Sequence, residues 1–141
     1  MITLPDDIIY LRQLLQRGYC CSAALAALGL RHKGNENPEL LDAMRGLCIG
    51  LGHGLICGAL TGAACLMTLL NPQAAAQGLT AELAEWFEYT YGAKYGGINC
   101  RDILGDLPIM RPLICPPIVE ETYKQAKQIL AANGYIFAED E

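Results

Sequence analysis

The sequence predicts an all-α fold, a single-domain bundle of about five helices, from three observations. Apolar residues recur at helical spacing through most of the chain, and helix start and stop signals separate these stretches. No stretch alternates polar and apolar residues as a half-buried strand does. The chain of 141 residues is long enough to bury a hydrophobic core, and its length is typical of one domain, which we expect over residues 1–141.

The first helix is predicted over residues 5–28. Pro5 suits a first helical turn, where Asp6 and Asp7 complement the positive end of the helix dipole as solvated side chains. The apolar positions with helical spacing are Ile8, Ile9, Leu11, Leu14, Leu15, Ala24, Leu25 and Leu28. The loop that follows is polar, and we expect His32 within it to be solvated.

Two further helices are predicted on either side of a glycine-rich turn. Asn37 is a suitable N-cap and Pro38 a suitable first residue for a helix that ends near Gly50. After the turn Gly52-His53-Gly54, a third helix can run to Leu70, where an Asn-Pro pair stops it.

The second half of the chain predicts two more helices and an irregular segment between them. Thr80 is a suitable cap for a fourth helix that runs to Ala93. Residues 95–117 show no helical pattern and carry two cysteines, so we expect an irregular segment folded over one end of the bundle. Pro116 and Pro117 open the last helix, and Asn133-Gly134 stops it.

The stretch 46–70 contains no Asp, Glu, Lys or Arg, which makes it a formal candidate for a membrane span. The Gly-His-Gly turn interrupts it, so we expect shielded helices and no membrane insertion. Glycine recurs in it at every fourth position, as Gly46, Gly50, Gly54, Gly58 and Gly62. This spacing predicts a glycine-rich central helix in close contact with a neighbour, and it also allows backbone N–H groups to approach a ligand or sulfur.

Charge and the amino terminus narrow the classes of partner and compartment. The net charge is -5, and the 10 Lys and Arg residues are spread singly, so no basic patch could follow a nucleic-acid backbone. The first residues carry Asp where a signal peptide needs basic residues. We therefore expect a cytoplasmic protein that binds neither nucleic acid nor membranes.

The chain contains seven cysteines, and none of them forms a Cys-x-x-Cys pair. Zinc ribbons, bacterial ferredoxins and thioredoxin-type sites all use that local spacing, so any site here must be assembled by the fold. An odd number of cysteines in a reducing compartment argues against a disulfide framework and leaves metal ligation, thiol chemistry or burial. Cys48 and Cys65 are interpreted as small buried apolar residues.

Three segments carry a resemblance to a known family. They are Tyr19-Cys20-Cys21, the glycine-rich run Cys57-Gly58-Ala59-Leu60-Thr61-Gly62, and Asn99-Cys100-Arg101, with Cys115 following before two prolines. Over residues 17 to 130 the chain resembles the family of redox-active proteins named for its pattern of Cys, Gly-Cys-Ala-x-x-Gly, Cys and Cys. The order here is Cys-Gly-Ala where the family name has Gly-Cys-Ala.

The resemblance implies an iron-sulfur site. Carried over, the family cysteines are Cys21, Cys57, Cys100 and Cys115, with the choice between Cys20 and Cys21 open. A similar domain in split-Soret cytochromes is associated with an iron-sulfur centre, which implies a [2Fe-2S] or [4Fe-4S] cluster here. The chain has no Cys-x-x-Cys-His motif, so covalent haem is not expected.

Several neighbours of these cysteines could support such a cluster. A four-thiolate cluster is anionic, so its burial needs N–H donors and positive charge. Gly54, in its loop, and the amide of Gly58 could supply the N–H donors, and Arg101 could offset the charge. The helix start beside Cys57 is expected to favour its thiolate. His53 could serve the sulfurs, or it could be a buried histidine bonded to a carbonyl.

We therefore expect a redox or electron-transfer module that serves a redox partner protein and is not a stand-alone enzyme. No carboxylate pair or Ser–His pair indicates a catalytic site. Two alternatives stay open. One is a metal-free thiol-disulfide protein that uses Cys20 and Cys21 with Cys57, and the other is a structural zinc module. The aromatic residues at 86, 87, 89, 91 and 95 indicate core packing or a possible homodimer contact.

Overall fold

The computed structural model describes residues 6–137, and within them every regular element is helical. An isolated antiparallel bridge joins Ile56 and Asn99. The α-helices are α1 (Asp6–Gln16), α2 (Cys21–Lys33), α3 (Pro38–Met44), α4 (Gly58–Leu70), α5 (Pro72–Ala74), α6 (Thr80–Phe87), α7 (Ala93–Tyr95), α8 (Cys100–Leu104) and α9 (Arg111–Ala132). Tighter or wider helical turns are η1 (Arg45–Leu47), η2 (Gly50–Gly54), η3 (Ala75–Leu79), η4 (Glu88–Gly92) and η5 (Pro108–Met110).

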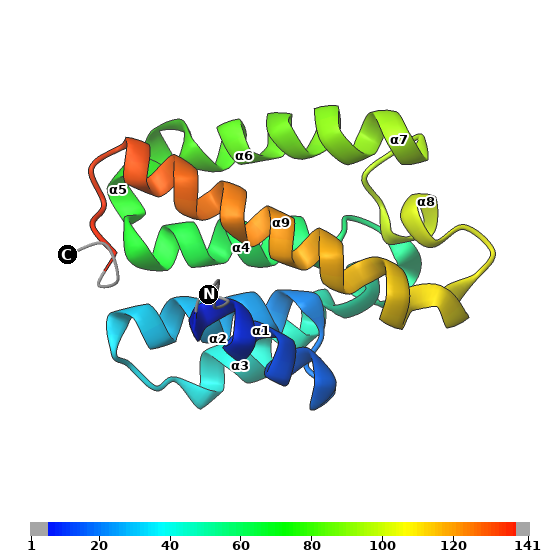
Figure 1. Cartoon of the computed structure of the whole chain (residues 1–141), viewed down its shortest axis with the longest axis horizontal. Helices are drawn as coiled ribbons and strands as arrows, with labels where there is room; N and C mark the ends of the chain where they lie inside the picture. The colour runs from blue at the N-terminus through cyan, green and yellow to red at the C-terminus, as the bar shows by residue number, and fades with distance from the viewer. Residues whose placement is uncertain (1–5, 138–141) are drawn as a thin grey trace, which may run out of the picture.

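Helix α4 lies in the middle of the bundle (Figure 1). It packs against α2 on one side and against α6 and α9 on the other, while α1 and α3 cover α2. Most of the largest fully buried side chains come from these helices, among them Leu25, Leu28, Leu66, Leu83, Phe87 and Tyr123. Burying a side chain of this size contributes about 1.5–3 kcal/mol. The all-α class is confirmed, with more helical segments than the five we expected.

The helix predicted over 5–28 is two helices, because the chain turns at Gly18 with φ of +93°. That conformation favours glycine, so α1 ends before it and α2 starts at Cys21. Helix α2 then continues past residue 28, the end that we predicted, and is capped at Gly34, whose φ is +71°. The proposed first-turn residue Pro5 lies outside the described residues.

The second and third predicted helices are shorter at their glycine-rich ends. Asn37 caps α3 as predicted, accepting the backbone N–H of Leu40 at 3.1 Å. Helix α3 ends at Met44 instead of Gly50, because the chain passes through the tighter turn η1, an extended Cys48 and then a left-handed backbone from Ile49 to Gly52. Helix α4 ends at the predicted Leu70.

The fourth predicted helix, 80–93, corresponds to α6, η4 and α7, which follow one another without a gap and end at Tyr95. Thr80 is not an N-cap, because the helical turn η3 leads directly into α6. The helical geometry is interrupted two residues before Thr80, at Gly78, whose φ is +142°.

The segment 95–117 is not irregular, because it contains α8, η5 and the first turns of α9. Helix α9 begins at Arg111, so Pro116 and Pro117 lie inside it and do not open it. Each proline lacks the N–H that an interior helical residue donates to the carbonyl four positions earlier. The stop at Asn133 is confirmed.

Among the regularly spaced glycines, only those on α4 bring two helices into close contact. A Cβ on Gly62 would lie 2.7 Å from the Cα of Ser22 on α2, so the two backbones touch there. Gly50 and Gly54 instead have positive φ angles in η2, and nothing lies within 4 Å of a Cβ built on Gly46. The expectation of one bare helix face over all five glycines is therefore wrong outside Gly58 and Gly62.

No helix among residues 6–137 is long and apolar enough to cross a membrane. The uncharged stretch 46–70 is divided between a loop and α4, which has 13 residues.

A buried polar network joins α1, α2 and α9, where we expected solvated side chains. Asp7 is 7% exposed and accepts the hydroxyl hydrogen of Tyr123. His32 donates from Nε2 to the Tyr123 oxygen at 3.0 Å and stacks edge-on against Phe137. Lys127 Nζ lies 3.6 Å from the Asp7 carboxylate. The solvated interpretations of Asp7 and His32 are therefore wrong.

Candidate functional site

Cys57 and Cys100 are brought together by a short backbone clamp. Two hydrogen bonds flank the Ile56–Asn99 bridge: the Cys57 N–H donates to the Ile98 carbonyl at 3.0 Å, and the Cys100 N–H donates to the Leu55 carbonyl at 2.7 Å. The two cysteines therefore sit on adjacent, antiparallel pieces of backbone, at the starts of α4 and α8.

The turn before Cys100 is fixed by a capping box. The Asn99 side chain accepts from the Asp102 N–H, and the Asp102 carboxylate accepts from the Asn99 N–H at 3.1 Å. A Cβ on Gly97 would lie 2.2 Å from that carboxylate, so glycine is required for its approach. The Asn-Cys-Arg-Asp sequence thus has a local structural role in presenting Cys100.

Cys21 and Cys115 complete the group from two other helices. Cys21 is the first residue of α2, and Gly58 lets α4 approach it, since a Cβ there would lie 3.3 Å from the Cys21 Cβ. Cys115 lies in the second turn of α9. The four cysteines line one cavity of about 10 Å³, whose other walls are Ala59, Ile103, Leu104, Ile118 and Val119.

The thiols in this cavity form two hydrogen-bonded pairs. Cys57 donates to Cys100, and this bond together with burial raises the pKa of Cys57 far above its ordinary value. The same bond, with the Gly58 N–H and the charge of Arg111, lowers the pKa of Cys100 to about 6 against the opposing effect of burial. Cys57 is therefore the protonated partner, although we expected its helix start to favour the thiolate.

The second pair has the same asymmetry. Cys21 donates to Cys115, which raises the pKa of Cys21 and lowers that of Cys115. Burial also raises the pKa of Cys21, and Arg111 contributes a hydrogen bond and its charge to Cys115. Each pair thus joins a donor thiol, whose pKa is raised, to an acceptor sulfur, whose pKa is lowered.

The positive charge at this site comes from Arg111, which the sequence interpretation missed. Arg111 lines the adjacent depression and acts on Cys21, Cys100 and Cys115, whereas Arg101 is exposed and does not shift the pKa of its neighbour Cys100. Arg111 stands four residues before Cys115, so the two share a helix face. That spacing could have identified it, had the last helix been predicted to start at residue 111.

The other predicted site residues have different surroundings. The Gly58 N–H donates to the Cys100 sulfur, in line with the expected role of that amide. Gly54 lies against Arg101, since a Cβ there would be 3.1 Å from the Arg101 Cβ, and it does not line the cavity. His53 is exposed, which contradicts the buried-histidine interpretation, and it is also absent from the cavity lining.

The remaining cysteines lie outside this cavity, and two of them form a disulfide. Cys20 is bonded to Cys48, with their Cα atoms 5.7 Å apart, so the interpretation of Cys48 as a simple buried apolar residue is wrong. Cys20 is therefore bonded outside the cavity, and of the adjacent pair only Cys21 lines the cavity with the other three cysteines. Cys65 is partly buried beside Ala23, Ala26 and Met44, as expected for an apolar role.

The donor set of the cavity suits a thiophilic cofactor, although the sulfurs are paired. Four thiols with no imidazole or carboxylate in the lining are the ligands that iron-sulfur clusters and zinc prefer. Among residues 6–137, however, no group of three or more His, Cys, Asp or Glu is arranged to hold a metal ion. A cavity of about 10 Å³ is the size of one water. A cofactor would therefore need the two pairs to separate.

Comparison with known proteins identifies the family. No curated protein and no solved structure matches the chain. The family model described as "Putative redox-active protein (C_GCAxxG_C_C)" matches residues 19–129, a range that contains all four cavity cysteines and the glycine-rich start of α4. The chain therefore belongs to the C_GCAxxG_C_C family of redox-active proteins.

Proposed function

We propose that this chain is an electron-transfer protein whose redox centre is an iron-sulfur cluster held by Cys21, Cys57, Cys100 and Cys115. The observation that carries the proposal is that these four residues, from four separate elements, line one cavity, while Cys20, Cys48 and Cys65 lie outside it. Such a cluster supplies one-electron chemistry when bound.

The surroundings of the four sulfurs favour an anionic centre. The N–H groups of Gly58 and Ala59 donate to the sulfurs of Cys100 and Cys57, and Arg111 supplies positive charge. Ile103, Ile118 and Val119 line the cavity and are buried, so part of its wall is apolar and dry. N–H donors, charge and burial are the means by which a protein sets the potential of a cluster.

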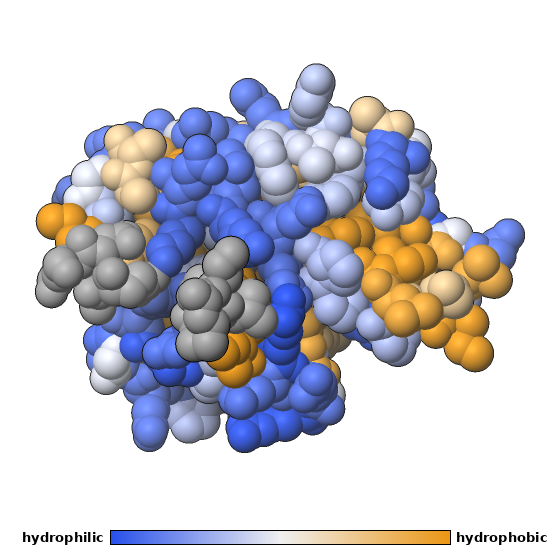
Figure 2. All heavy atoms as spheres, viewed as in Figure 1, coloured by the Kyte–Doolittle hydropathy of each residue, from blue (hydrophilic) through white to orange (hydrophobic). Residues whose placement is uncertain are grey.

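The same end of the molecule offers a surface for the redox partner. Figure 2 shows apolar side chains gathered over the segment from η5 to the start of α9. Three of them, Leu107, Ile109 and Leu113, are 59%, 82% and 69% exposed, next to the helix that carries Cys115. Apolar side chains grouped near a redox centre are typical of a transient docking site.

The test is an anaerobic visible spectrum of freshly purified protein, with iron, acid-labile sulfide and zinc measured on the same sample. We expect brown protein with equal iron and sulfide. Cys57→Ser and Cys100→Ser should lose most of the iron, and Cys65→Ser, the matched control outside the cavity, should keep it. Iron that is unchanged in the first two variants would reject the four-cysteine assignment.

A second candidate, a metal-free dithiol redox protein, is favoured by the pairing of the thiols. Cys57 already donates to Cys100, so a two-electron oxidant could join these sulfurs as a disulfide, with loss of the single Cys57 proton from the thiol–thiolate pair. This function predicts colourless protein that takes up no metal on anaerobic reconstitution and forms a Cys57–Cys100 disulfide on oxidation. Colourless protein with stoichiometric zinc would instead support the structural zinc module.

A further inference from the structure

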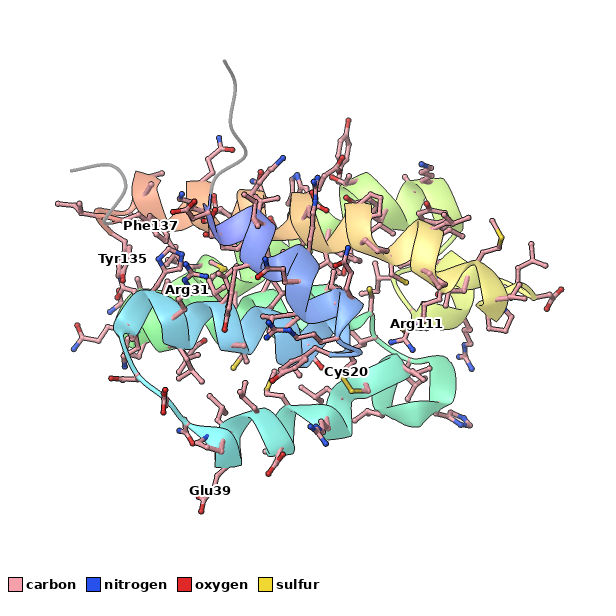
Figure 3. All side chains as sticks on the ribbon, turned by 60° about the horizontal axis from the view of Figure 1, so that its bottom comes forward. Cys20, Arg31, Glu39, Arg111, Tyr135 and Phe137 are labelled. Atoms are coloured by element: carbon pink, nitrogen blue, oxygen red, sulfur yellow. A yellow bond between two sulfur atoms is a disulfide. The ribbon has the colours of Figure 1, made fainter. Side chains whose placement is uncertain are left out.

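The disulfide between Cys20 and Cys48 lies at the surface, beside the four-cysteine cavity. Both residues are partly exposed, and both line a depression of about 320 Å³ that opens to solvent. Figure 3 shows the bond between the start of α2 and the segment after α3, at the same end of the molecule as Arg111. An attacking thiol can therefore reach it without unfolding the chain.

Basic side chains form the rim of this depression. Arg17 and Arg45 line it together with Tyr19, and no acidic residue belongs to the lining. Arg45 is partly neutralised, since its Nε lies 4.0 Å from the carboxylate of Asp42. Thiol–disulfide exchange proceeds through an anionic thiolate, and a positive rim raises the local concentration of anions.

The fold also has a place for the reduced form. Ser22 is fully buried and donates its hydroxyl hydrogen to the Met44 carbonyl at 3.0 Å. Its oxygen lies 3.4 Å from the Cys20 sulfur. The Ser22 hydroxyl hydrogen is already donated to the Met44 carbonyl. Its oxygen can therefore accept a hydrogen bond from the Cys20 S–H once the disulfide is reduced. Reduction therefore leaves no buried polar group unsatisfied there.

We propose that Cys20–Cys48 is a second redox site, which exchanges with the dithiol of a partner protein. A thiolate of the partner attacks one sulfur, the S–S bond breaks, and a mixed disulfide forms with release of the other cysteine as thiolate. The partner's second thiol then attacks the mixed disulfide and releases the remaining cysteine. The partner ends as a disulfide, and its two electrons and two protons end on Cys20 and Cys48.

The second site is in contact with the first through the backbone and a shared depression. Cys20 also lines a depression of about 240 Å³ together with Cys21, Cys115 and Arg111. The disulfide ties the start of α2 to the segment 48–56, which leads directly into Cys57. Its reduction frees that segment at one end, and the redox state of one site thereby affects the geometry of the other.

The first test measures the rate of reduction in the native protein. Protein equilibrated anaerobically with oxidised glutathione is treated with dithiothreitol, quenched by alkylation, and analysed for the peptides of Cys20 and Cys48. We expect a native rate within about tenfold of the rate in denaturant, since an exposed bond needs no global opening. A native rate about a thousandfold slower, or failure of the disulfide to form, would overturn the proposal.

The second test concerns the basic rim and uses small thiols of opposite charge. Reduced glutathione is anionic, and cysteamine is cationic. Arg17→Gln should slow reduction by glutathione by about twofold to fivefold at low salt, and the effect should vanish at high salt. Lys124→Gln removes the same charge from an exposed position on α9 and should change nothing. Equal rates for Arg17→Gln and the unaltered protein with both thiols would overturn the role of the rim.

The proposal does not depend on what the four-cysteine cavity holds. Its readout is the state of the Cys20 and Cys48 peptides, whereas the proposed cluster is tested by iron and sulfide content. Either one can therefore fail while the other stands.

Discussion

Arg111 is the residue whose charge acts on most of the thiols in the candidate site. It lies one helical turn before Cys115, and its charge also favours the thiolate forms of Cys21 and Cys100. Reduction of a cluster adds negative charge, which a nearby guanidinium stabilises. Arg111→Gln should therefore make the reduction potential of the proposed cluster more negative, by on the order of tens of millivolts.

The matched control for this prediction is Arg101→Gln. Arg101 is adjacent to Cys100 in sequence but exposed, and its charge does not act on the Cys100 sulfur as that of Arg111 does, so its loss should shift the potential much less. Protein-film voltammetry on both variants measures the two shifts. A larger shift for Arg101→Gln than for Arg111→Gln would restore the assignment that sequence adjacency suggested.

Asp7 makes the stability of the folded protein depend on pH in a predictable way. Burial alone would raise the pKa of Asp7, but the nearby His32, the Tyr123 hydroxyl and the charge of Lys127 outweigh it and hold the pKa well below its usual range. The folded pKa is below the unfolded value of about 3.9, so this stabilisation is complete above that value. It is lost as the pH falls through about 4 and towards the folded pKa.

The substitution Asp7→Asn should therefore lower the free energy of unfolding at pH 7 by about 2–3 kcal/mol. The variant should also lose less stability between pH 5 and pH 2 than the unaltered protein does. Asp6→Asn is the control, because Asp6 is exposed in the same helical turn. Denaturant unfolding across this pH range decides the matter, and parallel curves for Asp7→Asn and the unaltered protein would contradict the assignment.

At the scale of elements, the contact between α2 and α4 depends on one glycine. A methyl group on Gly62 would lie 2.7 Å from the Ser22 Cα, and backbone cannot yield as a flexible side chain can. Gly62→Ala should cost about 2–3 kcal/mol of stability. Gly46→Ala, from the same four-residue spacing, has no atom within 4 Å of the new methyl group and should cost little. Equal unfolding midpoints for the two variants would refute this account of the contact.

Several errors in element boundaries arise where glycine or proline has two roles. Gly18 ends a helix because its φ is positive, whereas Gly29 lies inside one because α4 packs against it. Pro116 and Pro117 lie inside α9, although proline more often opens a helix. The sequence shows the residue but not the tertiary contact that selects its role, which explains why the fold class and the Asn37 cap were predictable and these ends were not.

The candidate site divides in the same way. Cys21, Cys57, Cys100 and Cys115 could be named in advance because the family resemblance gives their order along the chain. Arg111 and the Cys20–Cys48 bond could not, since they depend on where α9 begins and on how the loop after α3 folds back to α2. Contacts between distant segments are set by packing, which no local pattern reports.

At the scale of the whole molecule, the two ends are held by different forces. The end near Asp7 is joined by the buried polar network and the aromatic residue Phe137. At the opposite end, four elements come together at the four cysteines. These cysteines belong to α2, α8, α9 and the residue before α4. A cluster bound there would cross-link these elements, so its removal should loosen this end and leave the other end intact.

Hydrogen–deuterium exchange of iron-loaded and iron-depleted protein tests this expectation. Exchange should rise after depletion in peptides that cover residues 19–25, 55–60, 98–105 and 109–117. Peptides from α6 and from the second half of α9 should change little, because core packing holds them. Cys65→Ser should reproduce the pattern of the unaltered protein, since Cys65 lies outside the cavity. A uniform rise along the chain would instead mean that the cluster stabilises the bundle globally, and no rise at all would mean that the four cysteines do not share a ligand.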